Sequence, residues 1–240
     1  MAFFGATLAP DAYLRMALAA RYAGPDATHW LGRDELGRDT LSRLLAGATT
    51  TLGETLAVIA VALSVGFLLD LIRRTVPGFD RAFVALVRVC FVAPDFLLGL
   101  SRAGTMAMAA LSAVLLSPGY LAAIVATVYL GPGPTGCVIA LGSLFAVVIA
   151  YVMPATSESA AMCRAALALF AWAILSVSAI DALGLGTMPP RPSWGTMLGG
   201  LNGLEALHGS TLLALGCLLA TAIAAIMLGE VLGERDSPSA

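Results

Sequence analysis

His29-Trp30-Leu31-Gly32-Arg33-Asp34-Glu35-Leu36-Gly37-Arg38-Asp39-Thr40-Leu41-Ser42-Arg43 is a polar stretch with three arginines and three acidic residues, directly ahead of the first long apolar run. Such a concentration of charge is costly inside a bilayer, so this stretch is expected at the membrane surface, leading into a spanning helix. Its glycines and Asp/Arg pairs predict a tight loop held by internal hydrogen bonds.

The composition is that of a membrane protein. Of the 240 residues, 59% are hydrophobic and only 12% are charged, whereas about 25% are charged in a typical soluble domain. The formal net charge is −2 and no basic cluster occurs, which argues against nucleic-acid binding. We therefore expect an all-α integral membrane protein built as a bundle of five or six transmembrane helices.

Five apolar segments are long enough to cross the roughly 30 Å hydrocarbon core of a bilayer. They cover about residues 51–72, 82–101, 105–130, 161–183 and 211–231. Arg73, Arg74 and Arg81 follow the first segment and are cytoplasmic by the positive-inside rule. The polar stretch and the N-terminus are then periplasmic, and the C-terminus is cytoplasmic. We divide the chain into a periplasmic N-terminal segment, 1–50, and a transmembrane domain, 51–235.

Residues 137–153 form a further apolar segment, and its 17 residues are at the lower limit for a span. If this segment lies in the membrane plane, the chain has five spans and the loop around Trp194 is periplasmic. If it crosses, the chain has six spans and that loop moves to the cytoplasm. The few arginines beyond this point do not decide between the two topologies.

A second motif lies far downstream, and together with the polar stretch it resembles a known family. It reads Leu183-Gly184-Leu185-Gly186, then Met188-Pro189-Pro190-Arg191-Pro192-Ser193-Trp194-Gly195-Thr196-Met197-Leu198. Both motifs are similar to segments of the inner-membrane permeases of the dipeptide/oligopeptide/nickel ABC importers, in the right order and at about the right separation. The resemblance covers about residues 25–235 and is weak between 102 and 154. The matching motif residues are His29, Trp30, Gly32, Asp34, Gly37, Arg38, Asp39 and Arg43, then Gly184, Gly186, Pro190, Trp194 and Gly195.

The resemblance implies one subunit of a type I ABC importer permease, which forms half of a translocation path. Its partners would be a second permease, two ATPase subunits and a periplasmic binding protein, and its cargo a peptide or a nickel chelate. The sequence has no catalytic constellation and no phosphate-binding Gly-x-x-x-x-Gly-Lys motif. We expect no enzymatic activity and no cofactor, with ATP hydrolysis carried by another chain.

Two departures from the family favour an alternative function. The family normally begins with an additional membrane helix, of which residues 4–10 resemble only the tail. The cytoplasmic coupling loop is represented by Ala140-Leu141-Gly142 and by Met153-Pro154, but its Glu-Ala-Ala acid is absent, and residues 119–154 carry no charge. The alternative is a permease homologue that serves as a structural subunit of a larger membrane complex, with 137–153 as its docking surface.

Charged residues inside predicted spans are costly and therefore functional candidates. Arg88 and Asp95 lie about two turns apart on one helix face. They either face a translocation path, as a pair or singly, or bond to a neighbouring subunit. Asp181 is the third candidate, with exposure at the membrane interface as its alternative. Glu54 and Asp70 lie near the two ends of the first span, where we expect water to reach them.

The remaining candidates point to structure. His29 and His208 lack a nearby carboxylate or cysteine pattern, so we expect no metal site. We expect Trp30 and Trp194 to lie at the membrane interface. The four cysteines are far apart inside apolar runs, which is typical of packing residues; they are Cys90, Cys137, Cys163 and Cys217.

Overall fold

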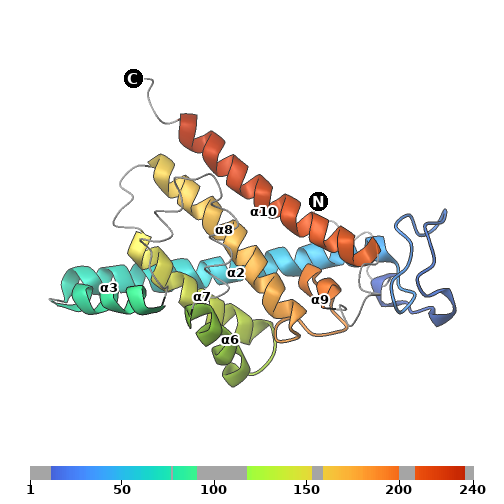
Figure 1. The fold of residues 1–240 in the computed structure, drawn as a ribbon, viewed down its shortest axis with the longest axis horizontal. Helices are drawn as coiled ribbons and strands as arrows, with labels where there is room; N and C mark the ends of the chain where they lie inside the picture. The colour runs from blue at the N-terminus through green and yellow to red at the C-terminus, as the bar shows by residue number, and fades with distance from the viewer. Residues whose placement is uncertain (1–11, 77, 91–117, 153–158, 200–208, 236–240) are drawn as a thin grey trace.

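A computed structural model describes residues 12–76, 78–90, 118–152, 159–199 and 209–235 (Figure 1). Over these ranges the chain forms seven α-helices and two short 3-10 turns, and its one β-type contact is an isolated bridge between Arg33 and Asp39. Four of the helices are long and apolar enough to cross a membrane. They are α2 (Thr40–Thr75), α7 (Pro134–Val152), α8 (Ser159–Ala182) and α10 (Gly209–Arg235). The predicted all-α membrane fold is confirmed.

Helix α2 begins within the polar stretch, eleven residues before the predicted first span. Asp39 caps it, since its carboxylate accepts a hydrogen bond from the Ser42 backbone N–H at 2.8 Å. The helix has 36 residues and is therefore about 54 Å long, well beyond the roughly 30 Å hydrocarbon core. The apolar pattern that marks a span thus covers only part of the helix that carries it.

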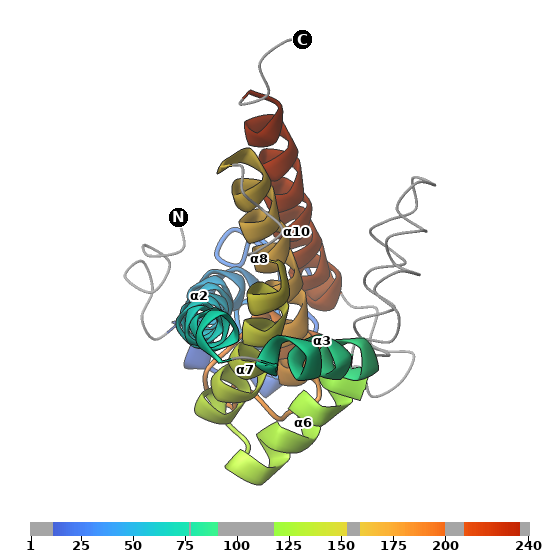
Figure 2. The same cartoon turned by 90° about the vertical axis from the view of Figure 1, so that its left-hand side faces the viewer.

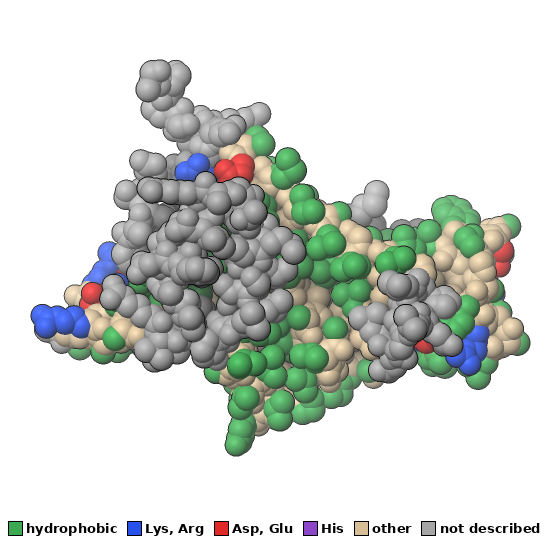
Figure 3. Space-filling view, viewed as in Figure 1, with side chains coloured by type: hydrophobic (Ala, Val, Ile, Leu, Met, Phe, Trp, Pro, Cys, Tyr) green, Lys and Arg blue, Asp and Glu red, His purple; other side chains and the backbone are tan. Residues whose placement is uncertain are grey.

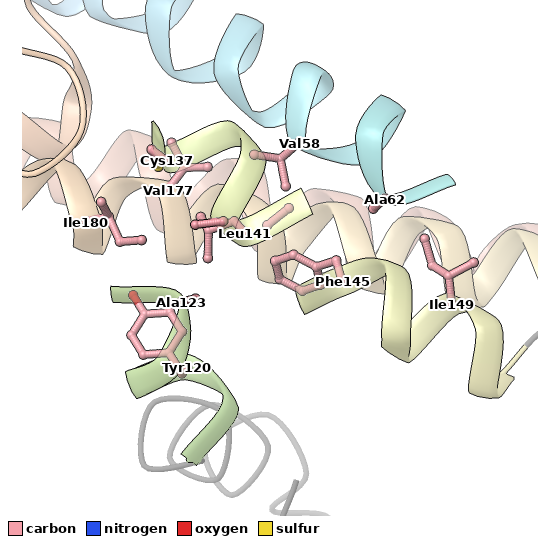
Figure 4. Packing of buried hydrophobic residues seen from close by; sticks show 12 residues of the cluster. Val58, Ala62, Tyr120, Ala123, Cys137, Leu141, Phe145, Ile149, Val177 and Ile180 are labelled. Atoms are coloured by element: carbon pink, nitrogen blue, oxygen red, sulfur yellow. The ribbon is translucent and has the colours of Figure 1, made fainter. Parts of the chain in front are cut away.

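The core forms where α7 packs against α2 (Figure 4). Val58 of α2 and Leu141 of α7 are fully buried there, together with Val177 of α8. Two glycines bring the helices close: a Cβ on Gly142 would lie 2.6 Å from Val61 Cγ1, and one on Gly66 would lie 2.9 Å from Ile149 Cγ2. Close backbone approach at small residues is how helices commonly associate in membranes.

Helices α8 and α10 lie side by side and form a second layer (Figures 1 and 2). The short helix α9 (Trp194–Leu198) packs between them and α2 (Figure 1). Trp194 packs there with Ile174 of α8 and Leu218 of α10. This apolar cluster joins the loop after α8 to the first half of α2.

Helix α7 runs in the same direction as α2. At its start, the Gly133 N–H donates to the Leu185 carbonyl at 2.9 Å, next to the loop that follows α8. At its other end, the Arg73 guanidinium donates to the Ala150 carbonyl. Trp194 nevertheless lies next to the end of the polar stretch, because it hydrogen-bonds to Leu44 and Thr51 in the first half of α2. From the sequence, a crossing by 137–153 was expected to move the Trp194 loop to the side opposite the polar stretch. In the structure, the loop and the polar stretch lie at the same end of α2 even though α7 runs alongside α2.

Two shorter helices cover parts of the predicted second and third spans. Helix α3 (Phe79–Cys90) is amphipathic, and Phe83 and Val87 bury its apolar face against Ala150 of α7. Helix α6 (Pro118–Leu130) packs on α7, with Tyr120 and Ala123 in the core. The remainder of both predicted spans, 91–117, lies outside the described residues.

The surface of the protein is apolar over the outward faces of its long helices and charged towards its ends (Figure 3). Exposed apolar side chains cover the outward faces of α2 and α10; they include Leu63, Phe67, Leu68, Leu219, Ile223 and Met227. On the face shown in Figure 3, the coloured charged side chains gather towards the ends of the molecule rather than its middle. This distribution fits a protein that spans a bilayer.

Candidate functional site

The polar stretch folds around one buried carboxylate, that of Asp34. Its Oδ1 accepts hydrogen bonds from the backbone N–H groups of Leu36 and Arg38, both at 2.9 Å. Its Oδ2 accepts from Arg38 Nε at 2.8 Å and from Arg43 Nη1 at 2.5 Å. The predicted tight, internally hydrogen-bonded loop is confirmed, with Asp34 as its centre.

The two glycines of this loop have a backbone reason. Gly32 and Gly37 have φ of +71° and +74°, a region that other residues rarely adopt. A Cβ on Gly37 would also overlap the carbonyl of Ala17, whose own N–H donates to the Leu36 carbonyl at 3.2 Å. Only glycine therefore lets the segment before the polar stretch pack against it.

Trp194 joins the two motifs. Its indole Nε1–H donates to the Leu44 carbonyl at 3.0 Å, and its backbone N–H donates to Thr51 Oγ1 at 3.0 Å. Ser193 starts α9 with a capping box that fixes this orientation. Trp194 is only 6% exposed, because its indole finds a partner inside the bundle. Trp30, in contrast, is 72% exposed.

Asp181 anchors the loop that follows α8. Its Oδ1 accepts a hydrogen bond from the Thr187 backbone N–H at 2.7 Å, and the residue is 1% exposed. A Cβ on Gly186 would overlap Asp181 Oδ1, and a Cβ on Gly195 would lie 2.5 Å from Asp181 Cβ. The expected alternative, exposure at the interface, is therefore wrong, because two motif glycines close over this side chain.

Glu54 reaches the same threonine from α2. Thr187 Oγ1 donates to Glu54 Oε1, and Glu54 is 9% exposed. The sequence placed this acid, like Asp70, where water could reach it, but both are buried. One signal in the sequence could have predicted the burial of Glu54. This acid lies about one turn after the predicted start of the span, where an acid is costly unless it has a partner.

An open cavity of about 770 Å³ lies beside Glu54, between the first half of α2, the start of α7 and the loop after α8. Its walls include polar side chains and several prolines; among them are Tyr13, Thr49, Glu54, Pro134, Thr187 and Arg191. The cavity therefore combines an apolar wall with one acid and one base.

Of the other candidates, Pro190 lines this cavity, and the rest lie apart from it or outside the described residues. Ala140, Leu141 and Gly142 are buried in α7. Pro190 and Gly184 are exposed in the loop after α8. Asp95, Pro154 and His208 fall outside the described ranges, and the side chain of Arg88 is not among those described.

His29 pairs with Asp26 on the outer side of the polar stretch, with Nδ1 at 3.2 Å from Asp26 Oδ1. Hydrogen bonds from the Thr28 hydroxyl and backbone, and from the His29 backbone, lower the pKa of Asp26 from its ordinary value. Across the ranges the structure describes, no three His, Cys, Asp or Glu side chains come together as a metal site.

The four long apolar helices and the charged ends of the bundle define a multi-pass helical membrane protein. No family model matches the chain. It is 31% identical to the di/tripeptide transport system permease protein DppC of Pseudomonas aeruginosa, over 73% of this chain and 60% of that protein. It is 27% identical to the glutathione transport system permease protein GsiD of Escherichia coli, over 89% of this chain and 73% of that protein. A 32% identity to the nickel transport system permease protein NikC of Escherichia coli covers 37% of this chain and 32% of that protein.

These relatives are all named transport system permease proteins, and their similarity over much of the chain supports a DppC/OppC/NikC-like ABC permease. The chain spans 60% of the length of the Pseudomonas DppC protein, and the same share of the GsiD protein of Pectobacterium atrosepticum.

Proposed function

We propose that the chain is a permease subunit of an ABC importer and forms half of a translocation path for a small peptide or a related solute. The observation that carries this proposal is the packing of its two permease-like motifs into one unit, through the Trp194 indole and the Leu44 carbonyl. The relatives named for di/tripeptide, glutathione and nickel transport support the choice of cargo, with a nickel chelate as a further candidate.

The partners follow from the same proposal. A second permease subunit completes the path, separate ATPase subunits supply the energy, and a periplasmic binding protein delivers the cargo. Arg88 and Asp95 remain candidates for polar groups on the path or at the contact with the second permease.

The orientation follows from charge. Arg73 and Arg74 end α2, so this end of the bundle is cytoplasmic by the positive-inside rule. The polar stretch and the Trp194 loop are then periplasmic, the N-terminus is outside and the C-terminus inside. Because α7 runs beside α2 from Val58 to Arg73, we propose that 137–153 crosses the membrane rather than lying in its plane.

A second function is favoured by a specific observation on α7. By the resemblance, this helix corresponds in sequence to the family's coupling loop. It carries no charged residue, and half of its apolar stretch is buried inside the bundle. A helix of this kind offers little polar surface to a soluble ATPase. The alternative is therefore a structural subunit of a larger membrane complex that lacks transport activity of its own.

Purification of the tagged chain from native membranes in mild detergent, followed by mass spectrometry, separates the two functions. An importer subunit retains ATPase subunits and a second permease at fixed stoichiometry. Stable association with a different membrane complex, without ATPases, would overturn the transport proposal in favour of the structural one.

A further inference from the structure

Two ion pairs line a hollow at the end of α2, next to the start of α3. Arg74 Nη2 lies 2.7 Å from Asp70 Oδ2, and Arg73 Nε donates to Asp80 Oδ1 at 2.9 Å. The four side chains border a volume of about 380 Å³, within the range of small-molecule sites. Basic and acidic side chains are both exposed at the end of the molecule where α3 lies (Figures 1 and 3). The hollow therefore presents charges of both signs to a ligand.

In each ion pair, one member is buried and the other is exposed. The side chains of Asp70 and Arg73 are 6% and 13% exposed, whereas those of Arg74 and Asp80 are 66% and 57% exposed. Arg73 is itself fixed, because its guanidinium also donates to the Ala150 carbonyl. A ligand in the hollow thus meets one basic and one acidic group, each held in place by a buried partner of opposite charge.

The hollow lies at the depth of the lipid headgroups. The predicted first span, residues 51–72, makes a helix about 33 Å long, close to the thickness of the hydrocarbon core, so Arg74 lies just beyond that core. Leu63, Phe67 and Leu71 are exposed on α2 at intervals of four residues, and Arg74 follows on the same face. An acyl chain against these apolar side chains places its headgroup beside Arg74.

The two exposed charges select among headgroups. Arginine binds phosphate through several N–H donors, and the ion pair of Arg74 with Asp70 uses its Nη2. A purely anionic headgroup at Arg74 would meet like charge at Asp80. A headgroup that also carries a primary ammonium suits both exposed side chains, because an ammonium has three N–H donors for the Asp80 carboxylate.

We propose that this hollow binds the headgroup of an aminophospholipid, with its phosphate on Arg74 and its primary ammonium on Asp80. The acyl chains of this lipid lie along Phe67 and Leu71. Basic pockets at the ends of membrane helices bind lipid headgroups in other proteins, and the exposed acid adds a preference for an amine here. The proposal goes beyond the transport function, because it involves neither the cargo nor the ATPase subunits.

The test uses the full chain, purified in detergent and freed of lipid, with native mass spectrometry as the readout. The probes are dilauroyl phosphatidylethanolamine, phosphatidylcholine and phosphatidylglycerol, which share their acyl chains and differ only in the headgroup. Phosphatidylethanolamine should be retained several-fold more strongly than phosphatidylcholine, whose quaternary ammonium has no N–H donor. It should also be retained more strongly than phosphatidylglycerol, which lacks the cationic group.

Two variants assign this preference to the hollow. Asp80→Asn keeps an acceptor for Arg73 but removes the charge, and should abolish the preference for phosphatidylethanolamine over phosphatidylcholine. Arg74→Gln should weaken the retention of all three lipids. Glu230→Gln changes an exposed acid of α10, so it is the matched control for Asp80→Asn and should leave retention unchanged.

The comparison of headgroups on the unchanged chain keeps the test decisive if Arg74→Gln, which removes the partner of buried Asp70, fails to fold. Equal retention of phosphatidylethanolamine and phosphatidylcholine would overturn the proposal, and so would stronger retention of phosphatidylglycerol. An unchanged preference in Asp80→Asn would overturn it as well. The assay contains no ATPase subunits, so its outcome is independent of the purification experiment that tests transport.

Discussion

Some glycines of the two motifs cannot be replaced without a steric clash, and Gly195 is the clearest case. A Cβ there would lie 2.5 Å from Asp181 Cβ and 2.8 Å from Ser178 Cα. We expect Gly195→Ala to destabilise the protein by about 1–3 kcal/mol through overpacking, seen as a lower thermal midpoint in detergent. Gly216 of α10 has no atom within 4 Å of such a Cβ, so Gly216→Ala should stabilise by about 0.5–1 kcal/mol. Equal midpoints for the two variants would contradict this account.

The Asp34 carboxylate gives a second prediction at this scale. Asp34→Asn leaves the guanidinium groups of Arg38 and Arg43 without their buried partner, at a cost of about 3–5 kcal/mol. Limited proteolysis of the polar loop should become much faster in this variant. Glu35 is partly exposed, and Glu35→Gln should change stability by less than about 1 kcal/mol. Similar cleavage rates in both variants would show that Asp34 is not the centre of the loop.

The sequence predicted the motif residues but not their partners. Charge and glycine patterns are local signals and singled out the polar stretch, while the family resemblance singled out Asp34, Gly37 and Trp194. The bonds from Trp194 to Leu44 and from Thr187 to Glu54 join residues more than 130 positions apart. No local pattern indicates such pairs, which is why the burial of Glu54 and of Trp194 was not predicted.

The crossing of helices α2 and α7 requires a glycine at position 142, because the two helices approach closely there. A Cβ on Gly142 would lie 2.6 Å from Val61 Cγ1 and 2.7 Å from Val61 Cβ. We expect Gly142→Ala to separate the two helices and to lower stability by about 1–3 kcal/mol. Gly53 of α2 has open space where a Cβ would lie, so Gly53→Ala serves as the control. Thermal midpoints measured on both variants in nanodiscs test the crossing, and a stable Gly142→Ala would argue against it.

Helix existence was predicted better than helix extent. Apolar runs gave the positions of α2, α7, α8 and α10, because a span must be apolar over about 20 residues. The start of α2 was missed because its first turns carry Arg43 and are capped by Asp39. A span is identified by its high mean hydropathy, and a polar first turn lowers that mean. Helix α3 was predicted from residue 82 as the start of a span, but its amphipathic character was missed, because an average of hydropathy does not distinguish the two faces of a helix.

In the assembled bundle, we expect α7 to cross the membrane. In a chain without its native cysteines, Thr135→Cys and Met188→Cys should react with an impermeant maleimide added to intact cells. Tyr151→Cys, at the other end of α7, should react only after permeabilisation. Equal labelling of positions 135 and 151 in intact cells would place α7 in the membrane plane.

We propose that this bundle is half of a path driven by nucleotide hydrolysis on another chain. The most direct measurement is the maleimide labelling rate of Thr49→Cys, in the cavity wall, in right-side-out vesicles loaded with ATP and vanadate. The exposed position Met16→Cys is the reference. We expect the labelling rate at position 49 to change several-fold when vanadate traps the ATPase, and the labelling rate at position 16 to stay the same. Identical rates at position 49 with and without vanadate would contradict an importer subunit and favour a structural one.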